Sequence, residues 1–273
     1  MKSRVWFITG ISSGLGKALA EEVMGNGDFV IGTLRDSKQV DAFNEKNREK
    51  GKAILLDITD YDSMEKRIAE IPKIDVLINN AGVGFIGAIE EASMKETRYV
   101  FEANFFAVLK LTRLILPKMR EQANGHIVQI SSHGGVKAFA GFGIYNASKF
   151  ALEGFSEALA QEVAPLGIKV TIVEPGPFRT EFASKGLQEA KKVIYDYAET
   201  SGVFKSKLKG VHGKQEGDPV KAAKAILKTV NEKSNSLRLP LGKIPMKTIQ
   251  MKLDSVKSDL ESNRKIAESV VFD

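Results

Sequence analysis

Short apolar runs alternate with segments of helical periodicity along most of this 273-residue chain. The apolar runs are rich in β-branched residues and end at Gly, Asn or Asp, a pattern typical of strands buried on both faces. We therefore expect a single α/β domain over residues 1–273, in which a doubly wound parallel sheet is flanked by helices. The predicted strands are Val5–Thr9, Phe29–Leu34, Ala53–Leu56, Val76–Asn79, Ile127–Ser131 and Val170–Glu174, and the predicted helices cover about Leu15–Gly25, Ser37–Lys50, Tyr61–Glu70, Lys95–Gln122 and Ile144–Leu166.

The segment from Pro175 to Pro219 interrupts this alternation. It has a helical stretch near Leu187–Glu199 and ends in a Gly-rich run. An insertion of this length after a strand is typical of a functional loop, so we expect a substrate lid near residues 178–217. Beyond it the pattern predicts a helix at about Val220–Glu232, a short strand at Leu237–Leu239, and a C-terminal helical extension over about residues 244–273.

Composition narrows the class of protein. With 43% hydrophobic and 27% charged residues, the chain is globular in composition, which excludes bulk disorder. It has no Cys, which excludes a thiolate zinc site and a Cys nucleophile, and its 3 His are not spaced as ligands, so no metal site is predicted. No apolar run approaches the roughly 18 residues of a membrane span, and the first strand begins too early for a secretory signal. We therefore expect a cytoplasmic protein without a membrane span.

The formal net charge of +6 is distributed unevenly along the chain. Residues 1–177 hold 21 basic and 22 acidic residues, a net of −1, whereas residues 178–273 hold 19 and 12, a net of +7. One interpretation is an electropositive substrate entrance or a site for an anionic partner. The other is a solvated Lys-rich surface, which we favour because the lysines are dispersed and lack interleaved aromatic residues. No nucleic-acid partner is predicted.

A glycine-rich turn follows the first predicted strand and opens the first helix, with the sequence Thr9-Gly10-Ile11-Ser12-Ser13-Gly14-Leu15-Gly16. Glycines let the backbone approach a pyrophosphate closely, and the helix N-terminus presents free N–H groups to it. The spacing is G-x3-G-x-G, a variant of the dinucleotide-binding fingerprint. It resembles the classical short-chain dehydrogenase/reductase family, with local similarity to hydroxysteroid and retinol dehydrogenases.

This resemblance covers nearly the whole chain and implies a Rossmann-type fold, a nicotinamide cofactor, and a dimer or tetramer. In the family, the residues that match Asp57 and Ile58 meet the adenine, and those that match Pro175 and Gly176 close over the nicotinamide. Thr180 matches a threonine that contacts the carboxamide. The cofactor-binding residues implied by the resemblance are Gly10, Ser12, Ser13, Gly14, Leu15, Gly16, Asp57, Ile58, Asn80, Ala81, Gly82, Tyr145, Lys149, Pro175, Gly176 and Thr180.

The end of the second predicted strand bears on the choice between NAD and NADP. The position of the family's NAD-selecting acid falls on Leu34, and Arg35 follows it. An acid there would bind the ribose 2′-OH, whereas a guanidinium can bind a 2′-phosphate. Asp36 weakens the argument because it could pair with Arg35, and Arg35 could also be a solvated loop residue. We expect NADP, with NAD less favoured.

The candidate catalytic residues are Ser132, Tyr145 and Lys149, and the resemblance adds Asn104 as the fourth member of the catalytic set. Tyr145 and Lys149 are four apart on a predicted helix and share a face, while Ser132 lies at the end of the fifth strand. A free phenol has a pKa near 10, which a neighbouring ammonium lowers. Ser132 would hold the substrate oxygen. The resemblance adds that Lys149 holds the nicotinamide ribose and that Asn104 orders a water beside it.

Two neighbours of the predicted catalytic serine are assigned other roles. Ser131 points to the opposite face of its strand and is predicted to be structural, and His133 is predicted to line the cleft or its loop. Aromatic and apolar residues of the lid and the loop after the fifth strand suit an apolar carbonyl substrate, or form the lid's own small core. These residues are Val136, Phe139, Phe142, Phe178, Phe182, Leu187, Tyr195, Tyr197 and Phe204.

The sequence thus predicts an NADP(H)-dependent oxidoreductase that acts on a small-molecule carbonyl or secondary alcohol. The alternative is a redox-sensing or regulatory protein that holds NADP(H) without turnover, although family members of that kind usually lack the tyrosine or the lysine. An epimerase or dehydratase of nucleotide sugars is disfavoured, because those relatives use another glycine spacing.

Overall fold

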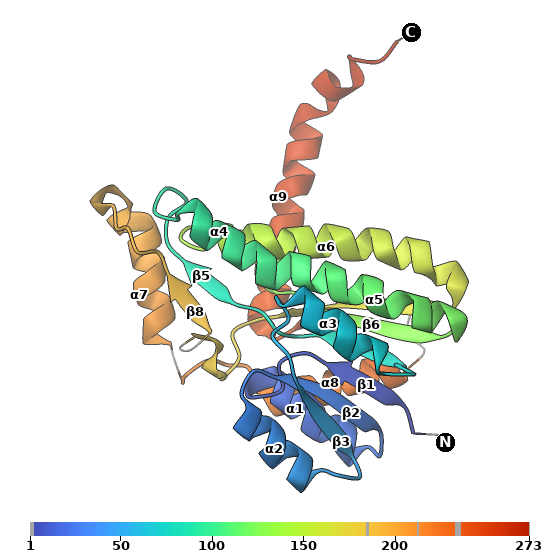
Figure 1. The fold of residues 1–273 in the computed structure, drawn as a ribbon. Coiled ribbons are helices and arrows are strands. Elements are labelled where there is room, and N and C mark those ends of the chain that lie inside the picture. The colour runs from blue at the N-terminus through green and yellow to red at the C-terminus, as the bar shows by residue number, and fades with distance from the viewer. Residues whose placement is uncertain (1–2, 184–185, 212, 233–235, 273) are drawn as a thin grey trace.

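The computed structural model describes residues 3–183, 186–211, 213–232 and 236–272, so part of the predicted lid lies outside the described residues. A seven-stranded parallel sheet forms the centre of a single domain, with the strand order β3-β2-β1-β4-β6-β7-β9 (Figure 1). The order reverses between β1 and β4, which makes the sheet doubly wound, as predicted. The strands are β1 (Val5–Ile8), β2 (Phe29–Leu34), β3 (Gly51–Leu55), β4 (Val76–Asn79), β6 (Gly125–Ile130), β7 (Ile168–Pro175) and β9 (Arg238–Leu241).

Helices cover both faces of the sheet, and each face has its own apolar core (Figure 1). Leu19 and Ile226 belong to one core, on α1 and α8, and Ile68 and Ile115 belong to the other, on α3 and α5. One face carries α1 (Gly14–Gly25), α2 (Ser37–Lys46) and α8 (Pro219–Asn231), and the other carries α3 (Tyr61–Ala69), α5 (Ala107–Glu121) and α6 (Gly143–Val163).

Two predicted helices differ from the structure. The predicted helix Lys95–Gln122 is α4 (Met94–Phe101) and α5, joined by a π-helical turn, η1 (Glu102–Phe106). The prediction of a helix near Leu187–Glu199 is wrong at its start, because Leu187–Glu189 is the strand β8. This strand pairs in parallel with β5 (Gly84–Ile86) in a small second sheet. Pairing with a strand 100 residues earlier overrides the local helical pattern.

Past β8 the lid segment is helical again, with η5 (Tyr195–Tyr197), η6 (Ala198–Gly202) and α7 (Val203–Gly210). It lies beside β5 and α4 at one end of the domain (Figure 1). Its beginning is tied to its end, since the Arg179 N–H donates to the Gly217 carbonyl at 2.9 Å. The segment is therefore closed on itself where it leaves and rejoins the domain.

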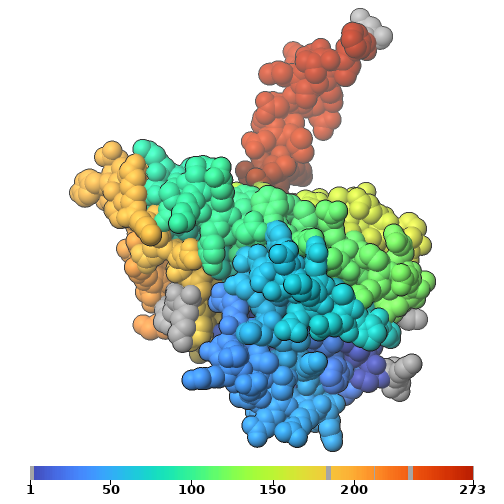
Figure 2. Space-filling view, viewed as in Figure 1, coloured from blue at the N-terminus to red at the C-terminus, as the bar shows by residue number. Residues whose placement is uncertain are grey.

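The chain ends in α9 (Lys243–Glu268), a 26-residue helix that extends away from the domain (Figures 1 and 2). Its first turns contact the rest of the described protein, where Pro245 is buried and the Thr248 hydroxyl lies 3.1 Å from His133 Nδ1. None of the helices in the described ranges combines the length and the hydropathy needed to cross a bilayer. The cytoplasmic location stays a prediction.

Candidate active site

The turn after β1 leaves no room for a side chain at position 16, so only glycine fits there. Gly10 and Gly14 have positive φ angles of 71° and 58°. A Cβ on Gly16 would lie 2.1 Å from the Gly10 carbonyl oxygen and 2.4 Å from Asn80 Nδ2. Because neither group can yield without breaking the turn, a side chain at position 16 is incompatible with this conformation. The glycine spacing therefore follows from contacts within the turn itself.

Helix α1 begins directly after this turn and has no side-chain cap. Its N-cap residue Ser13 makes no capping hydrogen bond, and the Ser12 and Ser13 side chains are exposed. The amide groups of the first turn are thus available to an anion, with the partial positive charge of the helix behind them. Leu15 anchors the turn by packing against the adjacent core. The residues present fit the pyrophosphate of a dinucleotide.

Hydrogen bonds between the ends of β1 and β4 hold the turn in shape. The Thr9 hydroxyl accepts from the N–H groups of Asn80 and Ala81, each at 2.9 Å. The Asn80 side chain donates to the carbonyls of Thr9 and Gly10 at 2.9 and 3.1 Å. Asn80 and Ala81 therefore shape the turn whether or not they also touch a cofactor. Gly82 comes next, and a Cβ there would lie 3.7 Å from Lys149 Nζ.

The segment after β7 returns to the glycine turn. A Cβ on Gly14 would lie 3.1 Å from the Thr180 Cβ, so Thr180 stands next to the N-terminus of α1. The Gly176 N–H donates to the Leu241 carbonyl at 3.0 Å, and a Cβ on Gly176 would lie 2.6 Å from the Pro245 ring. Pro175 is the last residue of β7. These contacts bring the predicted nicotinamide residues to the same edge of the sheet as the pyrophosphate turn.

The predicted adenine end lies where β2 and β3 finish. The Leu56 N–H donates to the Leu34 carbonyl at 2.9 Å, so Arg35 and Asp57 leave the sheet at neighbouring points. Arg35 is exposed and forms no ion pair with any residue that the structure describes. Asp36, which could have paired with it, instead caps α2 by accepting from the N–H groups two and three residues on. Asp57 accepts from Thr59, and Ile58 packs on the core beneath.

Ser132, Tyr145 and Lys149 come together at the carboxyl end of β6, and all three are buried. The Ser132 hydroxyl accepts from the Gly134 N–H at 3.0 Å and lies close enough to the Tyr145 hydroxyl to influence its pKa. Lys149 Nζ donates to the Ile130 carbonyl at 2.8 Å and lies 6.0 Å from the centre of the Tyr145 ring. The three predicted catalytic side chains thus form one cluster beside the glycine turn.

Burial sets the charge of this cluster. It raises the pKa of Tyr145 to about 12, although the hydrogen bond with Ser132 lowers it. Burial lowers the pKa of Lys149 to about 8, although the nearby Glu153 raises it. Near neutral pH, Tyr145 therefore carries its proton and Lys149 is largely an ammonium. A protonated phenol beside a cation is suited to donating a proton to a nascent alkoxide.

Asn104 lies in the π-helical turn and is fully buried. Its side chain exchanges two hydrogen bonds with the Val83 backbone, at 2.8 and 2.9 Å, and donates to the Ser148 hydroxyl at 3.0 Å. These bonds join η1, the segment after β4 and α6 directly behind Lys149. The Asn104 side chain thus holds these three segments together. Its ordering of a water stays a prediction.

The sequence analysis missed a buried charged cluster behind Lys149. Glu153 and Glu174 are both buried, and Arg238 lies 3.3 Å from a Glu153 oxygen and 3.0 Å from a Glu174 oxygen. Burial raises the pKa of Glu174 to about 7, and the charge of Glu153 adds to the effect. One feature of the sequence could have indicated this cluster, because Glu153 lies four residues after Lys149 and therefore shares the buried face of α6. Ser131, predicted to be structural, lies beside Glu153: a Cβ on Gly135 would contact both side chains.

An apolar wall of aromatic rings leads away from Tyr145. Its ring centre lies 4.8 Å from that of Phe142 and 5.9 Å from that of Phe182, and Phe142 contacts Phe204 on α7 at 5.4 Å. These rings pack on one another and also reach Tyr145, so they form both the core of the lid and an apolar border of the candidate site. Tyr195 is 89% exposed and takes no part.

His133 packs against this aromatic wall and not against Ser132, the predicted catalytic serine. Its ring lies 5.2 Å from that of Phe139, and its Nδ1 is bonded to the Thr248 hydroxyl. Burial lowers its pKa to about 4, so the ring is neutral. Its Nδ1 is hydrogen-bonded to α9, and no hydrogen bond among the described residues joins its ring to Ser132, so the two side chains do not form a base-and-nucleophile pair here.

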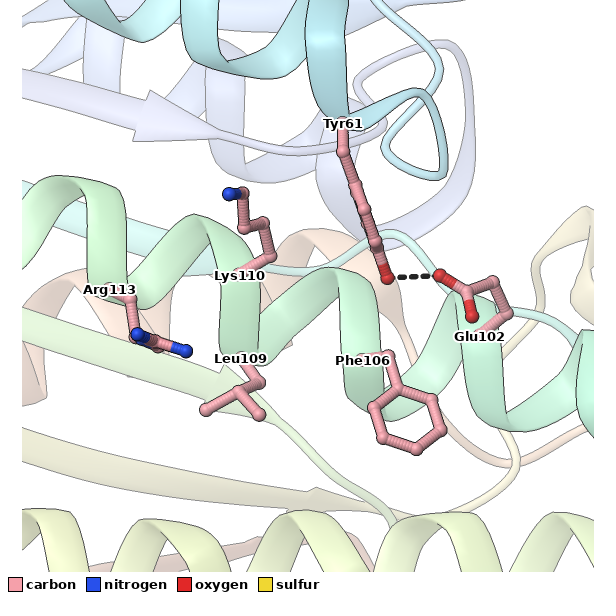
Figure 3. Close-up of a pocket in the computed structure, with 6 residues that line it drawn as sticks. All are labelled: Tyr61, Glu102, Phe106, Leu109, Lys110 and Arg113. Carbon is pink, nitrogen blue, oxygen red and sulfur yellow. Dashed lines mark hydrogen bonds between the residues drawn. The ribbon is translucent and has the colours of Figure 1, made fainter.

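A separate hollow of about 380 Å³ lies between the N-terminus of α3 and the start of α5 (Figure 3). The Tyr61 hydroxyl donates to the Glu102 carboxylate across it. None of the predicted catalytic or cofactor-binding residues lines it. Its lining residues are Tyr61, Glu102, Phe106, Leu109, Lys110 and Arg113.

Comparisons with known proteins agree with this geometry. Residues 4–191 match the model of a family described as short chain dehydrogenase. An oxidoreductase of Botryotinia fuckeliana is 38% identical over 245 residues, which cover 88% of this chain and 89% of that protein. A 3-ketodihydrosphingosine reductase of Bacteroides thetaiotaomicron is 37% identical over 270 residues, covering 96% and 95%. A solved short-chain dehydrogenase from Streptomyces avermitilis, 41% identical, matches with a TM-score of 0.92 over 99% of both chains.

Proposed function

Because the chain belongs to the short-chain dehydrogenase family of oxidoreductases, we propose that it transfers hydride between NADP(H) and an apolar carbonyl or secondary alcohol. The observation that carries this proposal is the buried cluster of Ser132, Tyr145 and Lys149 beside the glycine turn. A protein that only bound the cofactor would have no need to bury a protonated phenol and an ammonium together.

The proposed chemistry follows from the charges of the three side chains. A nicotinamide held by the glycine turn would supply a hydride for the carbonyl carbon, and Ser132 would donate a hydrogen bond to the carbonyl oxygen. As negative charge develops on that oxygen, the Tyr145 O–H bond breaks and its proton forms the alcohol O–H bond. The Lys149 ammonium stabilises the phenolate that remains. In the reverse direction the same phenolate accepts the alcohol proton.

We propose NADP rather than NAD because of the residues after β2. Arg35 is exposed, lies next to the predicted adenine end and is not neutralised by an acid in the described part of the chain. Asp36 is occupied as the cap of α2. A free guanidinium at this position favours a 2′-phosphate, and no carboxylate precedes it to bind a 2′-hydroxyl.

The proposed substrate class is a ketone that carries a long apolar chain. The rings of Phe142, Phe182 and Phe204 give the site an apolar border next to Tyr145. Two large apolar side chains are exposed near the lid, with Ile89 72% and Val193 76% exposed. The relative from Bacteroides is a 3-ketodihydrosphingosine reductase, and its named substrate has a ketone next to a long alkyl chain. Both the wall and this relative support a long-chain ketone.

The test is oxidation of NADPH and of NADH by the purified protein with methyl ketones of increasing chain length. We expect kcat/KM to rise with chain length and to be higher with NADPH. Equal rates for all chain lengths would contradict the apolar substrate class, and a preference for NADH would contradict the Arg35 argument. Tight binding of NADPH without turnover on any ketone would instead favour the sensor alternative.

A further inference from the structure

The buried face of α6 carries Tyr145, Lys149 and Glu153 at intervals of one helical turn. The proposed reaction uses the first two and leaves Glu153 without a role. A carboxylate that is only 5% exposed is costly to keep charged unless an opposite charge lies close to it. Glu153 has two such charges, the Lys149 ammonium one turn earlier and the Arg238 guanidinium at 3.3 Å. It therefore links the candidate site to the ion cluster behind it.

The end of β6 is where the Lys149 and Glu153 side chains come together. Lys149 Nζ donates to the Ile130 carbonyl at 2.8 Å. The Glu153 carboxylate lies beside the next residue along the chain, because a Cβ on Gly135 would lie 2.5 Å from the Ser131 hydroxyl and 3.2 Å from a Glu153 oxygen. Both side chains are buried. Two opposite charges thus lie at consecutive backbone positions in a region closed to solvent, where the attraction between charges is strong.

The ion cluster holds two buried carboxylates, and their surroundings differ. Glu174 is fully buried, and burial together with the charge of Glu153 raises its pKa to about 7. Burial raises the pKa of Glu153 as well, although the Ser131 hydroxyl and the Arg238 guanidinium lower it. Near neutral pH we therefore expect the proton of this pair to reside chiefly on Glu174, while Glu153 keeps its charge.

The charged groups that face Glu153 come from three elements. They are Lys149 and Glu157 on α6, Arg238 on β9 and Glu174 on β7. Burial lowers the pKa of Lys149 to about 8, and among the described residues Glu153 is the acid that opposes this effect. Glu157, one turn further along α6, also pairs with Arg238 but is half exposed. Glu153 is therefore the carboxylate of the cluster that acts on the candidate site.

We propose that Glu153 is a positioning residue that keeps Lys149 an ammonium and holds it at the end of β6. This inference rests on the proposed function, in which the Lys149 ammonium stabilises the Tyr145 phenolate. Arg238 in turn keeps Glu153 ionised. The rival interpretation is an ion cluster that only ties α6 to β7 and β9, since structural ion pairs also lie buried in proteins. A cluster of that kind would affect stability and leave the charge of Lys149 unchanged.

The first experiment follows the titration of Lys149 in the full-length protein, by NMR with ¹³C at the lysine Cε. The Lys149 resonance is the one that Lys149→Met removes. Glu153→Gln keeps the shape of the side chain and loses its charge, so Lys149 should titrate about one pH unit lower. Glu157→Gln, which removes the other α6 carboxylate paired with Arg238, is the matched control and should leave the titration in place. An unmoved titration in Glu153→Gln, or an equal shift in Glu157→Gln, would overturn the proposal.

A second variant separates charge from shape. Glu153→Asp keeps the carboxylate on a shorter side chain, so Lys149 should shift in the same direction as in Glu153→Gln, but by less. We expect both variants to fold, because Arg238 retains Glu157 and Glu174 as partners, and circular dichroism checks this. A larger shift in Glu153→Asp than in Glu153→Gln would assign the effect to packing and overturn the proposal. If Glu153→Gln did not fold, an unmoved titration in Glu153→Asp would overturn it.

The pH profile of ketone reduction with NADPH shows whether this charge serves turnover. In Glu153→Gln we expect kcat/KM to fall by about tenfold at about pH 9 and to stay near the wild-type value at about pH 6. Glu157→Gln should match wild type at both. Equal profiles for wild type and Glu153→Gln would overturn the role in turnover. A wild type that reduced no ketone would contradict the proposed function instead, and the Lys149 titration would still decide whether Glu153 sets its charge.

Discussion

The cofactor side and the substrate side of the site are built by different kinds of contact. On the cofactor side, residues 5–82, backbone groups and small polar side chains bond to one another, as Thr9 and Asn80 do around Gly10. On the substrate side, the described residues of 178–217 reach the domain through the short pairing of β8 with β5, through aromatic rings, and through side-chain hydrogen bonds such as that from the Ile194 N–H to the Glu91 carboxylate at 2.8 Å.

This difference determines which side of the site tolerates amino-acid substitutions. The turn is held by hydrogen bonds of 2.9 to 3.1 Å, and a Cβ added at Gly16 would lie 2.1 Å from the Gly10 carbonyl oxygen, so the turn has no room for an added methyl group. A wall of partly buried rings can re-pack around a lost or altered side chain. We therefore expect substitutions on the cofactor side to abolish binding, and those on the substrate side to change which ketones are used.

Of the substitutions that compare the two sides, Gly16→Ala should have the largest effect. The new methyl group would lie 2.1 Å from the Gly10 carbonyl oxygen, so the turn must open, and we expect NADPH affinity to fall by about a hundredfold or more. Isothermal titration calorimetry measures it. Gly25→Ala on the same helix is the matched control, since nothing lies within 4 Å of its added Cβ. Equal affinities for the two variants would remove the steric argument.

Arg35→Ala should have the next largest effect. Loss of a guanidinium that binds the 2′-phosphate should raise the KM for NADPH by about tenfold and leave the KM for NADH unchanged. The control is Lys46→Ala, which removes an exposed cation at the far end of α2. If both cofactors were affected alike, Arg35 would act on the adenosine or on the fold and would not set the preference.

Phe204→Ala tests the substrate side and should have a smaller effect. It removes the ring of α7 that packs on Phe142 at 5.4 Å. We expect the KM for long-chain ketones to rise by about fivefold, with short ketones and NADPH unaffected. Tyr195→Ala, at an 89% exposed position, should change none of these values. A loss of NADPH binding in Phe204→Ala would show that the two sides are not separable.

The smallest expected effect concerns stability and pH at Lys149, where the two sides meet. Burial lowers the pKa of Lys149 from 10.5 to about 8. Between these values the folded protein binds fewer protons at this site than the unfolded chain, so this group makes the free energy of unfolding rise with pH. The slope approaches about 1 kcal/mol per pH unit. Urea unfolding from pH 8 to 10 should show the slope in wild type and lose it in Lys149→Met; an equal slope in both would assign it to another group.

The sequence predicted those features that depend on residues close together along the chain. The strands of the central sheet, the glycine turn and the spacing of Tyr145 and Lys149 follow from period, turn chemistry and the face of one helix. The pairing of β8 with β5 could not be predicted in this way, because a strand of three residues carries too little local signal against a helical pattern. Nor could the cluster of Glu153, Glu174 and Arg238, whose members come together only when β7, β9 and α6 pack.

The capping of α2 by Asp36 shows a third case. The sequence placed Arg35 and Asp36 next to each other and left open whether they pair. The free N–H groups at a helix N-terminus compete with a guanidinium for a carboxylate. Here the Asp36 carboxylate accepts from the N–H groups of α2. Such competition between two plausible partners is resolved only by the geometry of the turn.

The central claim is that Tyr145 is the proton donor of a working oxidoreductase. The most direct measurement compares wild type and Tyr145→Phe in NADPH oxidation with a long-chain ketone, alongside NADPH binding. We expect the variant to bind NADPH as wild type does, while kcat falls by about a thousandfold. Turnover that survives the loss of the phenol, with binding intact, would contradict it.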